Sequence, residues 1–162
     1  MKKFLSVVLS IILMISIMPT GLFNATASAE NTVLNIYDAQ GLTTGLATAN
    51  ADIVLWNDIT YSSSIDVLCN SIDLNGYNLT FQSITLNTSL KNFSIMDQSY
   101  NSIDGTSTGE LKINGSLNIG NATCVIQSGI VSVTSGIVGS GNLEIQDGTV
   151  CVKGTNGSNG TN

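Results

Sequence analysis

The sequence predicts an all-β protein whose short strands coil into a solenoid of stacked parallel turns. Apolar and polar residues alternate over stretches of four to six residues, as expected for strands with one buried face. Turn-forming pairs such as Asn75-Gly76 separate these stretches, and one pattern recurs at a fixed interval. Beyond residue 29, only a weak helical pattern over 39–51 interrupts the alternation.

The first 29 residues have the layout of a secretory signal peptide. Lys2 and Lys3 precede an apolar run over 4–18, and small residues follow up to Ala29, with Ala27 as an alternative cleavage site. A retained anchor is the other interpretation, but the run is short for a bilayer core of about 30 Å. We therefore expect a secreted or cell-surface protein with no membrane span after cleavage near Ala29.

The charged residues exclude several classes of function. The chain has no His and no Arg, so it lacks the commonest general base and the guanidinium that clamps phosphate. Its net charge is −6, and removal of 1–29 leaves three lysines against eleven acidic residues, a net charge of −8. This balance argues against nucleic-acid binding, which needs a basic surface.

The elements follow one another closely after the leader. Residues 30–50 are expected to cap the first turn and protect its edge. Alternation then predicts strands, beginning within the cap itself, over 32–36, 52–56, 71–74, 78–81, 83–86, 93–96, 110–113, 116–119, 142–145 and 149–152. Turns are expected at Asn75-Gly76, Asn114-Gly115, Ser128-Gly129 and Asp147-Gly148, where positive φ angles are tolerated. The last residues, 155–162, form a Gly/Asn-rich tail or a truncated repeat.

A repeat favours a solenoid over a sandwich or a barrel. Residues 126–133 and 145–152 share the pattern Ile-Gln-x-Gly-x-Val-x-Val, nineteen positions apart. Stacked turns would place Ile126 over Ile145, and each turn would bury its apolar residues against its neighbours. Val131 over Val150 and Val133 over Val152 would continue the ladder, and 74–81 and 113–119 are looser copies.

Two stretches resemble secreted bacterial right-handed parallel β-helix proteins, the pectate-lyase-like fold used by surface proteins and adhesins. Residues 51–81 are similar to the opening turns of that family, and 142–160 to its Gly/Asn-rich repeat, with Asp147 where a Gly is usual. The resemblance implies a right-handed parallel β-helix with coils over 51–154.

The resemblance gives little support for catalysis. Enzymes of this fold that cleave polyuronates use a basic residue, usually Arg, together with carboxylates that bind calcium. This chain has no Arg and its acidic residues are scattered, although Asp73 and Asp97 could meet on adjacent coils. We expect no enzyme activity and no cofactor. Asp97 and Asp104 are weak calcium candidates, and an ordinary polar loop is the favoured interpretation of 97–104.

Aromatic rings are the candidates for carbohydrate binding, because a flat ring stacks on a pyranose face. Trp56, Tyr61 and Tyr77 are the residues that could form an exposed stacking patch. Trp56 follows Leu55 in an alternating strand, so packing against the cap is its favoured role.

The three cysteines allow at most one internal disulfide and form no metal or redox motif. Cys124 and Cys151 lie in alternating strands, and we predict that they are small buried side chains rather than a bridge. The third is Cys69.

Together these features predict an exported, non-catalytic β-helix scaffold, a cell-surface or adhesin-type protein that presents loops for binding. The alternative is a carbohydrate-binding or polysaccharide-degrading module of the same fold. The expected partner is extracellular polysaccharide or a host or cell-wall surface.

Overall fold

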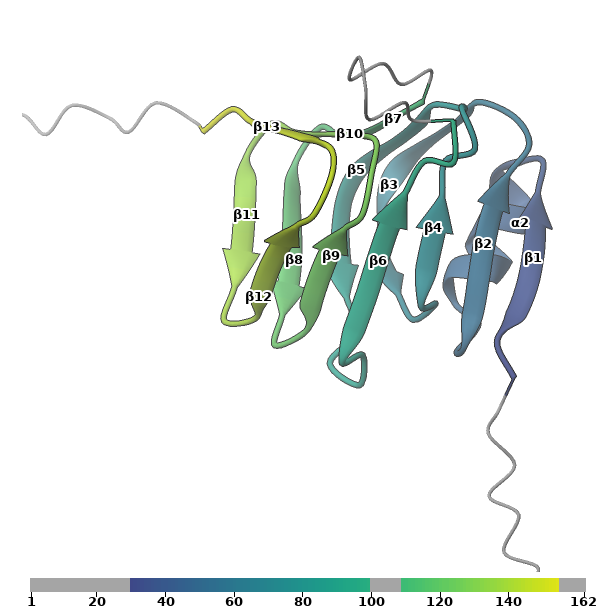
Figure 1. Cartoon of the computed structure of the whole chain (residues 1–162), viewed down its shortest axis with the longest axis horizontal. Helices are drawn as coiled ribbons and strands as arrows, with labels where there is room; N and C mark the ends of the chain where they lie inside the picture. Colours follow the sequence, from purple (N-terminus) through teal and green to yellow (C-terminus); the bar gives the residue numbers. More distant parts are fainter. Residues whose placement is uncertain (1–29, 100–108, 155–162) are drawn as a thin grey trace, which may run out of the picture. The chain divides into compact units, whose positions relative to one another are not determined.

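The computed structural model describes residues 30–99 and 109–154 and confirms a parallel β-solenoid (Figure 1). The predicted signal peptide and the tail lie outside these residues. The strands are β1 (Thr32–Ile36), β2 (Ala51–Leu55), β3 (Ile59–Val67), β4 (Ser71–Asp73), β5 (Leu79–Leu86), β6 (Asn92–Met96), β7 (Glu110–Ile113), β8 (Ser116–Gly120), β9 (Thr123–Ile126), β10 (Ile130–Val133), β11 (Gly136–Gly139), β12 (Asn142–Ile145) and β13 (Thr149–Val152).

All pairings between these strands are parallel and link one turn to the next. The first sheet has six strands in the order β1-β2-β4-β6-β9-β12. The second follows the order β11-β8-β5-β7-β10-β13, with β3 paired to β5. The long strand β5 pairs with β7 through Leu79–Phe81 and with β8 through Ile84 and Thr85, so it spans two successive sides of its turn.

The core is a set of side-chain ladders that run through the stacked turns. In the first sheet, register places Ile53 beside Ile72, Ile72 beside Ile95, and Ile95 beside Ile126. All four side chains are fully buried. The predicted stacking of Ile126 on Ile145 is confirmed, as are Val131 on Val150 and Val133 on Val152. The core is thus built from contacts between neighbouring turns.

One helix, α2 (Ala39–Leu46), covers the first turn, within the weak helical pattern noted in the sequence. The Asp38 side chain accepts a 2.8 Å hydrogen bond from the Gly41 N–H and so caps its N-terminus. Leu42 and Leu46 are fully buried, which anchors the helix to the core. No helix in the described part of the chain is long and apolar enough to cross a membrane.

The predicted turn pairs differ in what they require of the backbone. Asn75 and Gly76 adopt φ angles of 47° and 84°, which confirms a left-handed turn between β4 and β5. Asn114 and Gly115 do not adopt positive φ. Gly115 is needed there because a Cβ atom would collide with the Gln82 carbonyl and the Ser83 hydroxyl of the adjacent turn. Residues 113–119, a looser copy of the repeat, form a different corner from residues 126–133. They join β7 to β8, whereas residues 126–133 join β9 to β10.

Candidate functional site

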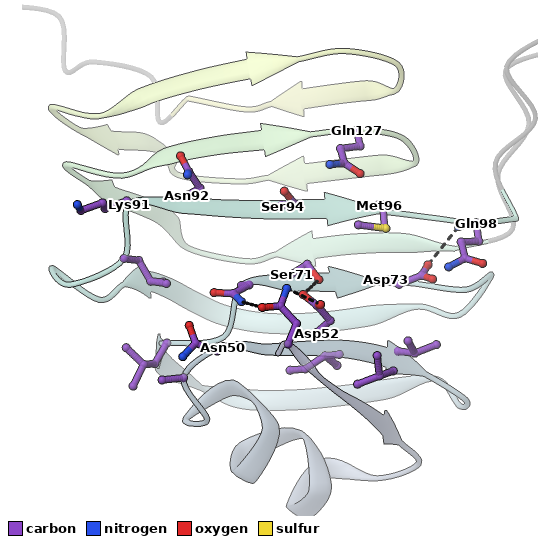
Figure 2. A pocket seen from close by; sticks show the side chains of 18 of the residues that line it. Asn50, Asp52, Ser71, Asp73, Lys91, Asn92, Ser94, Met96, Gln98 and Gln127 are labelled. Carbon is purple, nitrogen blue, oxygen red and sulfur yellow. Dashed lines mark hydrogen bonds between the residues drawn. The ribbon is translucent and has the colours of Figure 1, made fainter. Parts of the chain in front are cut away.

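A groove crosses the outer face of the first sheet. In β2, Ile53 and Leu55 are buried, so Asp52 and Val54 face outward. The equivalent outward positions of neighbouring turns enclose a cavity of about 770 Å³ (Figure 2). Its polar lining consists of Asn31, Asn50, Asp52, Asn70, Ser71, Asp73, Ser89, Lys91, Asn92, Ser94, Gln98 and Gln127.

One end of the groove holds a network of fixed polar side chains. Asp52 accepts a 2.6 Å hydrogen bond from the Ser71 hydroxyl and a 2.9 Å bond from the Asn31 amide. Asn70 donates to the Asn31 side-chain oxygen at 3.1 Å. These residues come from three consecutive turns, and Figure 2 shows Asp52 and Ser71 close together in the network. The network fixes the orientation of the polar groups at this end of the groove.

Asp73 lies at the other end of the groove and is only 3 % exposed. Its Oδ1 accepts hydrogen bonds from the Asn75 N–H at 2.9 Å and the Gln98 N–H at 3.1 Å, whereas its Oδ2 has no hydrogen-bond partner. Burial, opposed by these bonds, raises the pKa of Asp73 above its ordinary value, and the negative charge of Asp97 adds to the rise.

The structure brings Asp97 and Asp73 together on adjacent turns. Asp97 is 1 % exposed and accepts hydrogen bonds from the Gly76 N–H at 2.8 Å and the Ser99 hydroxyl at 2.7 Å. The other weak calcium candidate, Asp104, lies outside the described residues, so calcium binding by Asp97 and Asp104 stays a prediction. Within 30–99 and 109–154, no three acidic or cysteine side chains gather as metal ligands would.

The three aromatic candidates have different surroundings. The Tyr61 ring packs edge-on against Phe81, with centroids 6.0 Å apart, and Tyr77 is partly buried against the core. Trp56 instead stacks beside Tyr37, with centroids 6.4 Å apart and an interplanar angle of 22°. Neither ring pair found in the described chain joins Trp56 to Tyr61 or Tyr77.

Sequence reasoning did not pair Tyr37 with Trp56, although a signal was present. The two residues are nineteen positions apart, the spacing of the 126–133 and 145–152 repeat. Each follows the last residue of its strand, and those last residues, Ile36 and Leu55, lie in register. The repeat therefore places the two rings on neighbouring turns.

The prediction for the cysteines is half right. Cys124 is buried, as is Cys69, and burial raises the pKa of these thiols to about 11 and about 12. Cys151 is exposed, and the prediction that it is buried is wrong. Cys151 pairs with Ser132 of β10, and the neighbours of Ser132, Val131 and Val133, are the residues of that strand that are buried. Cys151 therefore lies on the outward face of β13, between Val150 and Val152. All three thiols are free.

Comparison with protein-family models, with curated proteins and with solved structures gave no match for this chain.

Proposed function

We propose that this protein is an exported, non-catalytic β-solenoid that binds extracellular polysaccharide in the groove of its first sheet. The observation that carries the proposal is the groove itself, about 770 Å³, lined by side chains from several consecutive turns. A groove that crosses many turns suits an extended ligand. The signal-peptide pattern in 1–29 and the sequence resemblance to secreted β-helix proteins support export.

The lining favours a neutral, hydroxyl-rich chain. Amide and hydroxyl groups dominate it, and each can donate or accept a hydrogen bond. Asp52 and Asp73 outnumber Lys91, the one lysine of the lining, and the chain from residue 30 carries a net charge of −8. Both features disfavour a polyanionic ligand such as a uronate polymer.

The test is electrophoresis of residues 30–162 through native gels that contain soluble polysaccharides. We expect laminarin or hydroxyethylcellulose, which are neutral glucans, to retard the protein more than polygalacturonate does. Asn92→Ala should weaken retention about two- to tenfold, the worth of one neutral hydrogen bond.

Asn142→Ala is a matched control for that variant. Asn92 and Asn142 both pair with Thr123 of β9, so they occupy the same column of the first sheet, but only Asn92 lines the groove. The control should bind as the wild type does. If no polysaccharide retards the wild type, the proposed function is wrong.

Asp73 supports one second candidate, polysaccharide hydrolysis. A buried carboxyl with a raised pKa in a groove has the property that a general acid needs. Incubation with the same glucans, followed by an assay for new reducing ends, tests it. Product that disappears in Asp73→Asn would replace the binding proposal with an enzymatic one.

A further inference from the structure

Two aromatic residues beside the groove form a surface that the groove does not include. We define Tyr37 and Trp56 as the aromatic pair. Both remain exposed, Tyr37 by 59 % and Trp56 by 47 %, although their rings are stacked at 6.4 Å. Single exposed apolar residues are ordinary, but two adjacent rings held in one orientation present a continuous apolar surface.

Two hydrogen bonds fix Trp56, one member of the aromatic pair, to the preceding turn. The Trp56 N–H donates to the Ile36 carbonyl at 2.8 Å, which continues the strand pairing, and the indole Nε1–H donates to the Asn35 side-chain oxygen at 2.9 Å. Because the one polar group of the indole is already satisfied, the surface that it offers to solvent is its ring carbons. Such a surface recognises a ligand by stacking.

The aromatic pair continues the groove along the outer face of the first sheet. Val54 lines the groove, and Trp56 occupies the next outward position on the same side of the chain, because Leu55 between them is fully buried. Successive outward positions of a strand are about 7 Å apart, a distance comparable with one sugar unit. A glycan in the groove can therefore extend over the rings.

We propose that the aromatic pair is a stacking subsite for an uncharged pyranose ring at one end of the groove, an inference that rests on the proposed function. The C–H face of a pyranose is apolar and matches exposed ring carbons, while its hydroxyls remain in water. Asp38 directly follows Tyr37 and Asp58 lies two residues after Trp56, in a chain that from residue 30 carries a net charge of −8. These charges select against a uronate at this position.

Tryptophan fluorescence tests the subsite directly, because Trp56 is the only tryptophan of the chain. Residues 30–162 are titrated with laminarin and with hydroxyethylcellulose, and gel retardation measures total binding in parallel. We expect a saturable change in Trp56 emission with at least one neutral glucan and a much weaker one with polygalacturonate.

Substitutions separate stacking from other roles of the ring. Tyr37→Ala and Trp56→Ala should each weaken gel retention about tenfold, whereas Trp56→Phe, which keeps a ring, should stay within about twofold. Val138→Ala is the control, because Val138 is 49 % exposed but lies on β11 of the second sheet. Circular dichroism checks that each variant is folded. If an alanine variant does not fold, the change in Trp56 emission of the wild-type protein on titration with glucan still tests the subsite.

The two proposals fail in different ways. Retention by a neutral glucan with unchanged Trp56 emission and undiminished binding by Tyr37→Ala would overturn the subsite and leave the groove in place. A Trp56 response with undiminished binding by Asn92→Ala would support the subsite and overturn the groove. Absence of any retention or emission change would overturn both.

Discussion

Truncation of Ile95 tests whether stability resides in the ladder between turns. Ile95 is fully buried between Ile72 and Ile126, whereas Ile145, the last isoleucine of the same ladder, is 50 % exposed. Replacement of isoleucine by alanine removes three carbon groups, worth about 2.4 kcal/mol when they are fully buried. A cavity that relaxes only partly adds about 1 to 2 kcal/mol. Ile95→Ala should therefore lower the free energy of unfolding by about 3.5 to 4.5 kcal/mol.

Ile145→Ala is the matched control for this prediction. Half of its side chain is already in water and no closed cavity forms, so the expected loss is about 1 kcal/mol. Urea unfolding followed by circular dichroism measures both values, and the midpoint shift is read at constant slope. Equal losses at the two positions would refute the assumption that each turn is stabilised by its neighbours.

Three further predictions concern other parts of the chain. A thiol reagent at pH 8 should modify one cysteine, Cys151, in the native protein and three after denaturation, because the other two thiols are buried; fast reaction of more than one native thiol would contradict this. Gly141→Ala should destabilise by over about 1 kcal/mol, because its Cβ would collide with the Ala122 carbonyl, whereas Gly154→Ala meets nothing and should be neutral in thermal unfolding. The folded chain holds the Asp73 proton more tightly than the unfolded chain, so the free energy of unfolding should fall as the pH rises above 3.8, the ordinary pKa of an aspartate. Asp73→Asn should make this fall smaller, as measured by urea unfolding at pH 3 and pH 7. An unchanged pH dependence in the variant would exclude Asp73 as the source of the fall.

The fold could be predicted from sequence where the turn length is constant. Ile126 and Ile145 are nineteen residues apart and stack as the repeat indicated. Ile72, Ile95 and Ile126 belong to the same ladder, but the spacing between them varies, so a fixed-interval search does not align them. The core pattern of alternating residues was sufficient to assign strands but insufficient to assign register in those turns.

The site was only partly accessible to sequence reasoning, because Asp52 and Ser71 have the nineteen-residue spacing of the repeat whereas Asn31 and Asp52 are 21 residues apart. Asp52, Ser71 and Asn31 are brought together by strand register alone. Cys151 illustrates a related limit, since an alternating strand identifies two faces and only packing decides which one is inward. Trp56 likewise donates a hydrogen bond to Asn35 of the preceding turn, a contact that strand register brings about.

The nineteen-residue register between β9 and β12 also suggests how such a protein can change length. A duplication of one whole turn would insert side chains that match those above and below, because Ile126 already stacks on Ile145 and Val131 on Val150. Each added turn would extend both sheets by about 4.8 Å and leave the existing contacts in place. Gene duplication could thus lengthen this molecule in unit steps, with no need to redesign its interior.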